Sequence, residues 1–129
     1  QANAFVEKLP ESYDGYIAQS GSNLSGGQRQ RLSIARAVCR RPEIFIFDDS
    51  FSALDYKTDR ALRQALDKEC GDATRLIVAQ RIGTIRNADK IIVLDEGRVA
   101  GMGTHEELMK NCSVYQEIAL SQLSKEELA

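Results

Sequence analysis

The sequence predicts an α/β fold with a mostly parallel sheet. Residues 44–47 form a continuous apolar run, Ile-Phe-Ile-Phe, which is typical of a strand covered on both faces in a parallel sheet. A helical pattern over residues 57–69 and a second strand over residues 75–79 follow that run. A strand, a helix and a strand at this spacing predict a right-handed crossover unit with parallel strands.

The opening stretch is expected to be the end of a helix followed by a loop. Ala4 and Phe5 supply the apolar positions of that helix, which Pro10 stops. Glycines then mark residues 12–23 as a loop.

The next helix, from residue 26 to about residue 40, begins with a sequence that suits an anion. Ser25 and Gln28 fit the capping-box pattern S-x-x-Q. Gly26 and Gly27 let the backbone approach a ligand closely, and a helix start presents N–H groups with a partial positive charge. The pattern G-x-x-x-x-G-K-[ST], which would wrap the same phosphates, does not occur in the sequence.

Acidic residues follow the strand of residues 44–47. Asp48 and Asp49 stand at the expected carboxyl edge of the sheet, where open α/β folds place their ligands. A carboxylate at this edge suits Mg²⁺, which prefers oxygen ligands and keeps several waters, so Asp48 is the predicted metal residue. Asp55 comes next, after a loop, and either only begins the following helix or also serves the site.

The rest of the chain is expected to hold short elements. They are a helical turn over residues 82–86, strands over 90–95 and 98–102, helices over 104–110 and 114–123, and a frayed polar tail over 124–129. Glu96 and Gly97 predict a hairpin between the two strands. Thr104 and Glu107 predict a capping box.

The composition is that of one globular domain. The chain has 129 residues, of which 43% are hydrophobic and 28% charged. Its apolar runs are far shorter than the roughly 20 residues that a membrane-spanning helix needs. The chain opens at Gln1 without a methionine or a signal-like segment, so we expect it to be a piece of a longer protein.

Charge and cysteine content argue against several classes of protein. The net charge of −2 gives no general attraction to nucleic acid. Five arginines crowd one segment, and cations near a helix end and on its exposed face are the favoured explanation. These residues are Arg29, Arg31, Arg36, Arg40 and Arg41. The 3 cysteines are far apart and odd in number, which predicts neither a disulfide framework nor a zinc site.

Together these segments resemble the second half of the ATP-binding domain of ABC transporters. Residues 24–28, Leu-Ser-Gly-Gly-Gln, are similar to the signature motif of that family, and residues 44–49 to its Walker B strand. Residues 52–55, Ser-Ala-Leu-Asp, are similar to its D-loop, and residues 79–81 to its switch region. The sequence of residues 88–108 is similar to that of exporter-type members, in which membrane helices precede the ATPase on one polypeptide.

The resemblance covers nearly the whole chain and implies a particular fold. It implies a partial P-loop NTPase (RecA-like) core that lacks the P-loop strand, plus the end of the α-helical subdomain. Residues 1–41 would be the end of that subdomain with the signature helix, and residues 42–129 the C-terminal part of the ATPase core. The P-loop strand normally lies between the strands of residues 75–79 and 90–95, so we expect unpaired strand edges.

The resemblance also implies ATP and Mg²⁺ as cofactors and membrane transport driven by ATP hydrolysis at the cytoplasmic face of the cell membrane. In this family two ATP-binding domains close head to tail, and each ATP lies between the Walker motifs of one domain and the signature motif of the other. The implied site residues are Asp49 and Gln80 for catalysis, Asp48 for the metal, and Ser25, Gly26, Gly27, Gln28 and Asp55 for binding ATP. A P-loop is lacking, so we expect no activity of the isolated chain.

The sequence departs from the family pattern in the hydrolytic set. The family has a glutamate and a histidine where this chain has Asp49 and Gln80. Asp49 is shorter by one methylene, about 1.5 Å of reach, and a misplacement near ~1 Å can cost roughly a hundredfold in rate. Gln80 donates through its amide but cannot take up a proton. We therefore expect a slow, ATP-retaining site here and a different subunit as partner.

Two other functions stay open. One is a non-hydrolytic regulatory or assembly module that uses the same dimer surface. The other is a soluble ABC-type ATPase acting on nucleic acid, against which the acidic balance and the exporter-like residues 88–108 argue.

Overall fold

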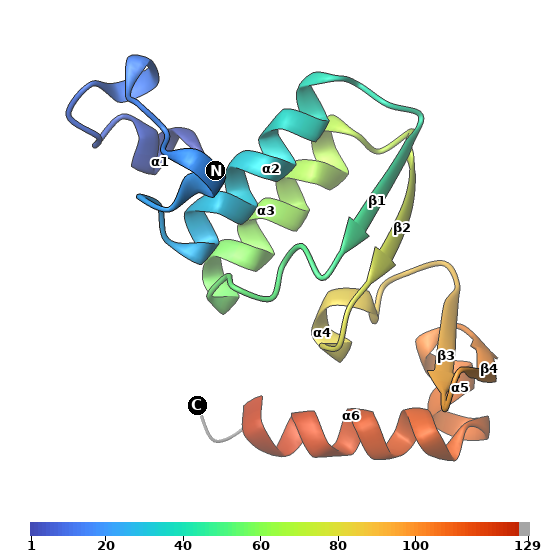
Figure 1. Ribbon diagram of the computed structural model, residues 1–129. Helices are drawn as coiled ribbons and strands as arrows, with labels where there is room; N and C mark the ends of the chain where they lie inside the picture. The colour runs from blue at the N-terminus through green and yellow to red at the C-terminus, as the bar shows by residue number, and fades with distance from the viewer. Residues whose placement is uncertain (127–129) are drawn as a thin grey trace. The chain divides into compact units, whose positions relative to one another are not determined.

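The computed structural model describes residues 1–126, and the chain divides into two compact units (Figure 1). The first unit spans residues 1–78, and the second begins at Ala79. The predicted division between residues 41 and 42 concerns the subdomains of a family and stays a prediction.

The first unit is built around a parallel pair of strands. Its elements are α1 (Asn3–Val6), 3-10 turns at Ser12–Asp14 and Gln19–Gly21, α2 (Gly26–Cys39), β1 (Ile44–Asp48), α3 (Tyr56–Glu69) and β2 (Thr74–Val78). Strand β1 pairs in parallel with β2, with Ile44 opposite Thr74 and Asp48 opposite Val78. The predicted order of strand, helix and strand and the parallel pairing of the two strands are confirmed.

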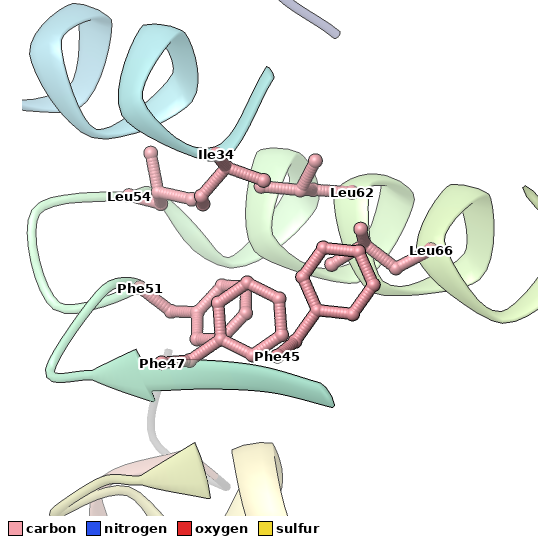
Figure 2. Packing of buried hydrophobic residues seen from close by; sticks show 7 residues of the cluster. All are labelled: Ile34, Phe45, Phe47, Phe51, Leu54, Leu62 and Leu66. Carbon is pink, nitrogen blue, oxygen red and sulfur yellow. The ribbon is translucent and has the colours of Figure 1, made fainter. Parts of the chain in front are cut away.

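One face of β1 carries the core of the first unit. Phe45 and Phe47 point from this strand toward Ile34 of α2 and Leu62 and Leu66 of α3 (Figure 2). The two phenyl rings stack with their centroids 5.5 Å apart. Burying each side chain of this kind contributes roughly 1.5–3 kcal/mol, so the cluster holds both helices on the strand.

The opposite face of this sheet is exposed, and the prediction that β1 is covered on both faces is therefore wrong for the described residues. Ile44 is 62% exposed and Ile46 is 69% exposed, with Leu76 and Val78 of β2 at 54% and 53%. Successive side chains of a strand point to opposite faces. Helices α2 and α3 both pack on the face of Phe45 and Phe47, which leaves the alternate residues uncovered.

The second unit contains an antiparallel hairpin and helices. Its elements are α4 (Ile82–Ile85), β3 (Ile91–Asp95), β4 (Arg98–Gly103), α5 (His105–Asn111) and α6 (Ser113–Glu126). Glu96 and Gly97 have φ angles of +45° and +75°, which suits a type I′ turn, and β3 pairs antiparallel with β4 as predicted. The predicted capping box of Thr104 and Glu107 is confirmed at the start of α5.

Helix α6 runs beyond its predicted end at residue 123 to Glu126. Lys125 and Glu126 are good helix formers, so a polar composition alone does not end a helix here. The rest of the predicted tail, residues 127–129, lies outside the described residues.

Each unit has its own two-stranded sheet and its own core. In the second unit the core cluster consists of Ile91, Val93, Leu108, Cys112 and Tyr115. In the described part of the chain β1 pairs only with β2 and β3 only with β4, so each strand has an unpaired edge, as expected for a chain without the P-loop strand.

Candidate functional site

The first turn of α2 presents hydrogen-bond donors. Ser25 Oγ accepts from the Gln28 backbone N–H at 3.2 Å, and Gln28 Oε1 accepts from the Ser25 backbone N–H at 2.9 Å, which confirms the predicted capping box. The serine proton and the glutamine amide hydrogens remain as donors. The N–H groups of Gly26 and Gly27 have no acceptor within the helix. This set of donors suits an anion.

The glycine pair also packs against a loop of the same chain. A Cβ atom on Gly27 would lie 3.0 Å from the Ala53 carbonyl oxygen, and one on Gly26 would lie 3.4 Å from the Ala53 Cβ. Both glycines were expected to serve a ligand, and their contact with Ala53 was not predicted from the sequence. Gly27 is therefore required by intramolecular packing as well.

Two of the clustered arginines have structural partners. Arg29 Nη1 donates to the Leu24 carbonyl at 3.0 Å and to the Gly21 carbonyl at 3.3 Å, and so holds the loop before α2. The Arg31 guanidinium lies 4.8 Å from the centroid of the Phe5 ring. Arg29 and Arg31 therefore contact the protein itself, whereas the sequence explained the whole cluster by a helix end and its exposed face.

Asp49 has an uncommon backbone conformation. Its φ angle is +47°, in the left-handed region, which aspartate tolerates better than most residues. Its N–H donates to the Val78 carbonyl at 3.0 Å, and its carbonyl accepts from Ser52 Oγ at 3.0 Å. Asp48, the last residue of β1, and Asp49 are both exposed.

Gln30 of α2 binds the loop that follows β1, a contact that was not predicted from the sequence. Its Nε2 donates to the Asp49 carbonyl and to Ser52 Oγ, each at 3.2 Å. Its Oε1 accepts from the Ala53 N–H at 3.0 Å. The spacing carried a signal, because Gln30 lies four residues after Gly26 and so shares its helix face.

An open cleft of about 520 Å³ lies between α2 and the end of β1 in the first unit. Of the predicted site residues, Gly26, Asp48 and Asp49 line this cleft, together with Gln30 and Arg29 among others. The structure thus brings part of the signature helix and both strand-end carboxylates to one concave surface.

Asp55 caps α3. Its Oδ2 accepts from Thr58 Oγ1 at 2.7 Å and its Oδ1 from the Thr58 backbone N–H at 2.9 Å. These bonds from Thr58, the side-chain bond first, lower the pKa of Asp55 because they stabilise the carboxylate. Asp55 therefore does begin the helix, and its further role at an ATP site stays a prediction.

Gln80 belongs to the second unit, where α6 holds the backbone around it. Gln122 Nε2 donates to the Gln80 carbonyl at 2.7 Å, and Gln122 Oε1 accepts from the Ile82 N–H at 2.8 Å. The Gln80 side chain is exposed. Gln122 lies 42 residues further along the chain, and no local pattern in the sequence indicated this contact.

Within residues 1–126 no group of three or more histidine, cysteine, aspartate or glutamate side chains is arranged to hold a metal ion. In the same part of the chain, no helix has the length and apolar character needed to cross a bilayer.

Comparisons with known proteins place these features in one family. A family model described as ABC transporter matches residues 1–52. A putative ABC transporter ATP-binding protein of Mycoplasma genitalium is 46% identical over 121 residues, which is 94% of this chain and 19% of that protein. The ATP-dependent lipid A-core flippase of Haemophilus influenzae is 43% identical over 120 residues, covering 93% of this chain and 20% of the flippase.

A solved structure agrees with the sequence relatives. A bacterial Atm1-family ABC exporter with ATP bound matches 93% of this chain with a TM-score of 0.88 and 36% sequence identity, over 21% of the exporter chain. The chain thus spans about a fifth of the length of these relatives. It belongs to the ATP-binding family of ABC transporters and has exporter-type relatives.

Proposed function

We propose that this chain is part of an exporter subunit in which ATP hydrolysis at a head-to-tail pair of ATP-binding domains drives membrane transport. The observation that carries the proposal is the first turn of α2, where the side-chain oxygens of Ser25 and Gln28 are occupied by the capping box and N–H groups remain as donors, together with the strand-end carboxylate of Asp49, where the family has glutamate. The Haemophilus flippase is ATP-dependent and the solved exporter has ATP bound, which supports the same activity. Exporter relatives also support membrane helices on the same polypeptide and a position at the cytoplasmic face of the membrane.

In this proposal the chain contributes to two ATP sites. Ser25, Gly26, Gly27 and Gln28 donate hydrogen bonds to the phosphates of an ATP held by the partner domain. Asp48 would hold Mg²⁺ at the other ATP, the one bound to the subunit itself. A single exposed carboxylate fits Mg²⁺, which takes one or two carboxylates together with waters and phosphates and neutralises phosphate charge when bound.

The remaining residues determine how fast the subunit's own site works. Asp49 orients the attacking water, and Gln80 donates its amide to the terminal phosphate. Asp49 has a shorter reach than glutamate, and Gln80 cannot accept a proton, so this site retains ATP more than it hydrolyses it. Asp55 contributes to the interface between the domains. The partner is therefore a different subunit whose own site is competent.

Restoring the family residues tests this asymmetry. In the full-length protein with its partner, the double variant Asp49→Glu with Gln80→His should raise hydrolysis at this subunit's site by roughly 10- to 100-fold. Asp95→Glu, at the end of β3, is the matched control and should change nothing. Hydrolysis at family-typical rates by the full-length wild-type protein without a second type of subunit would contradict the proposal.

The 129-residue chain alone should neither hydrolyse ATP nor bind it tightly, because the first turn of α2 acts on phosphates that another element holds. Titration with a fluorescent ATP analogue measures this directly. Micromolar affinity for the chain alone would be incompatible with the proposed division of labour.

A further inference from the structure

We propose that Gln30 is a positioning residue that couples the first turn of α2 to the loop carrying Asp49. The inference rests on the proposed function, in which the first turn binds the partner's ATP and the loop serves the ATP of this subunit. Gln30 would then link the two sites within one chain.

The Gln30 amide spans the whole loop. Its nitrogen donates to the Asp49 carbonyl at the start of the loop, and its oxygen accepts from the Ala53 N–H four residues later. The nitrogen also donates to Ser52 Oγ, which itself donates to the Asp49 carbonyl. One side chain of α2 therefore fixes both ends of the segment.

The hydrogen bonds from Gln30 matter because Asp49 has a left-handed backbone conformation. A left-handed residue other than glycine is strained, and such a conformation persists when the surrounding contacts determine it. Gln30 and Ser52 both bind the carbonyl of this residue. Removing the Gln30 amide should let the backbone of Asp49 relax, and the direction of its carboxylate would change with it.

The first turn of α2 contacts the same loop from the helix face that carries Gln30. Gly27 is in close contact with the Ala53 carbonyl, and Gln30 follows it by three residues, so the loop contacts this face over successive turns. A displacement of the first turn on binding phosphate is then transmitted through a rigid helix and these hydrogen bonds to the loop.

Hydrogen exchange on the full-length protein with its partner tests the proposal. Gln30→Met removes every hydrogen bond of the amide at similar size, whereas Gln30→Glu keeps only the acceptor for Ala53. Gln64→Met, an exposed position on α3, is the control. Without ATP, the Ala53 amide should exchange on the order of tenfold faster in Gln30→Met and remain protected in Gln30→Glu and in the control.

The response to ATP measures the coupling. In the wild type with ATP already retained at the subunit's own site, further ATP that fills the partner's site should slow exchange both in residues 25–28 and in residues 49–53. In Gln30→Met the slowing should remain in residues 25–28 and be lost in residues 49–53. In Gln30→Glu the Ala53 amide stays protected, but the ATP response of Asp49 should still be lost, which a purely structural role of Gln30 does not predict.

Three results would contradict the proposal, and each concerns a different claim: the hold of Gln30 on the loop, the coupling to ATP, or the proposed function. Unchanged exchange at Ala53 in Gln30→Met overturns the hold on the loop, and an intact ATP response of residues 49–53 in that variant overturns the coupling. If ATP binds to the wild type and neither segment responds, the proposed function fails and the coupling fails with it. The exchange of Ala53 without ATP still decides whether Gln30 holds the loop.

Discussion

Alanine at Gly27 should destabilise the first unit, whereas alanine at Gly26 should not. Both glycines lie in the first turn of α2, so each substitution gains a similar helix propensity, up to about 1 kcal/mol. The difference between the two variants therefore reports the contact with Ala53. This contact is 3.0 Å for a Cβ on Gly27 and 3.4 Å for one on Gly26.

The size of each change in stability depends on which atom the added Cβ would contact. At Gly26 the neighbour is at ordinary van der Waals distance, so Gly26→Ala should be neutral or stabilise by roughly 0.5–1 kcal/mol. At Gly27 the neighbour is a backbone oxygen, which cannot rotate away as a side chain does, and the loop itself must move. Overpacking of this kind costs roughly 1–3 kcal/mol, and the two variants should differ by about that amount.

Equilibrium urea unfolding of the chain, followed by far-UV circular dichroism, measures the difference. The two variants should unfold with similar denaturant dependence and different midpoints, with Gly27→Ala the less stable. Equal midpoints, or a higher midpoint for Gly27→Ala, would refute the reasoning from the Ala53 contact.

Other predictions concern single contacts. Gln122→Ala should speed hydrogen exchange of the Ile82 amide several-fold, because that amide donates to the Gln122 side chain, whereas Gln116→Ala on the same helix should leave it unchanged; equal effects would contradict the assignment. Leu62→Ala should lower the free energy of unfolding by about 2–5 kcal/mol through the cavity it leaves in the core, and a loss below about 1 kcal/mol in urea unfolding would show that the core collapses around it. The lowered pKa of Asp55 stabilises the fold fully above its ordinary value of 3.8, and this contribution is lost as the pH falls through the lower native pKa. Asp55→Asn keeps a capping oxygen without a charge, so below pH 3.8 its unfolding midpoint should change less with pH than that of the wild type. An identical pH profile of the two proteins would argue against the cap.

The local signals of the sequence predicted most of the fold. Capping boxes at Ser25 and Thr104 and the turn at Glu96 and Gly97 each depend on residues within a few positions of one another, and all were confirmed. The crossover from β1 to β2 followed from the spacing of apolar runs.

Long-range packing was harder to predict. An apolar run such as residues 44–47 shows that a strand is apolar on both faces, but the run does not show whether both faces are covered within the chain. The same limit explains the missed contacts of Gln30 and Gln122, because each amide binds backbone groups 19 or more residues away. The roles of Asp48, Asp49 and Gln80 depend on a nucleotide and a partner domain, so they stay predictions.

The left-handed backbone of Asp49 gives its identity a second explanation. Short polar side chains tolerate this conformation better than longer ones, so aspartate suits the backbone while glutamate suits the reach to a water. Asp49→Glu should therefore gain hydrolysis and lose some folding stability, and Asp49→Gly should do the reverse. Aspartate at position 49 therefore favours stability over activity: it gives a slower site than glutamate but a less strained backbone.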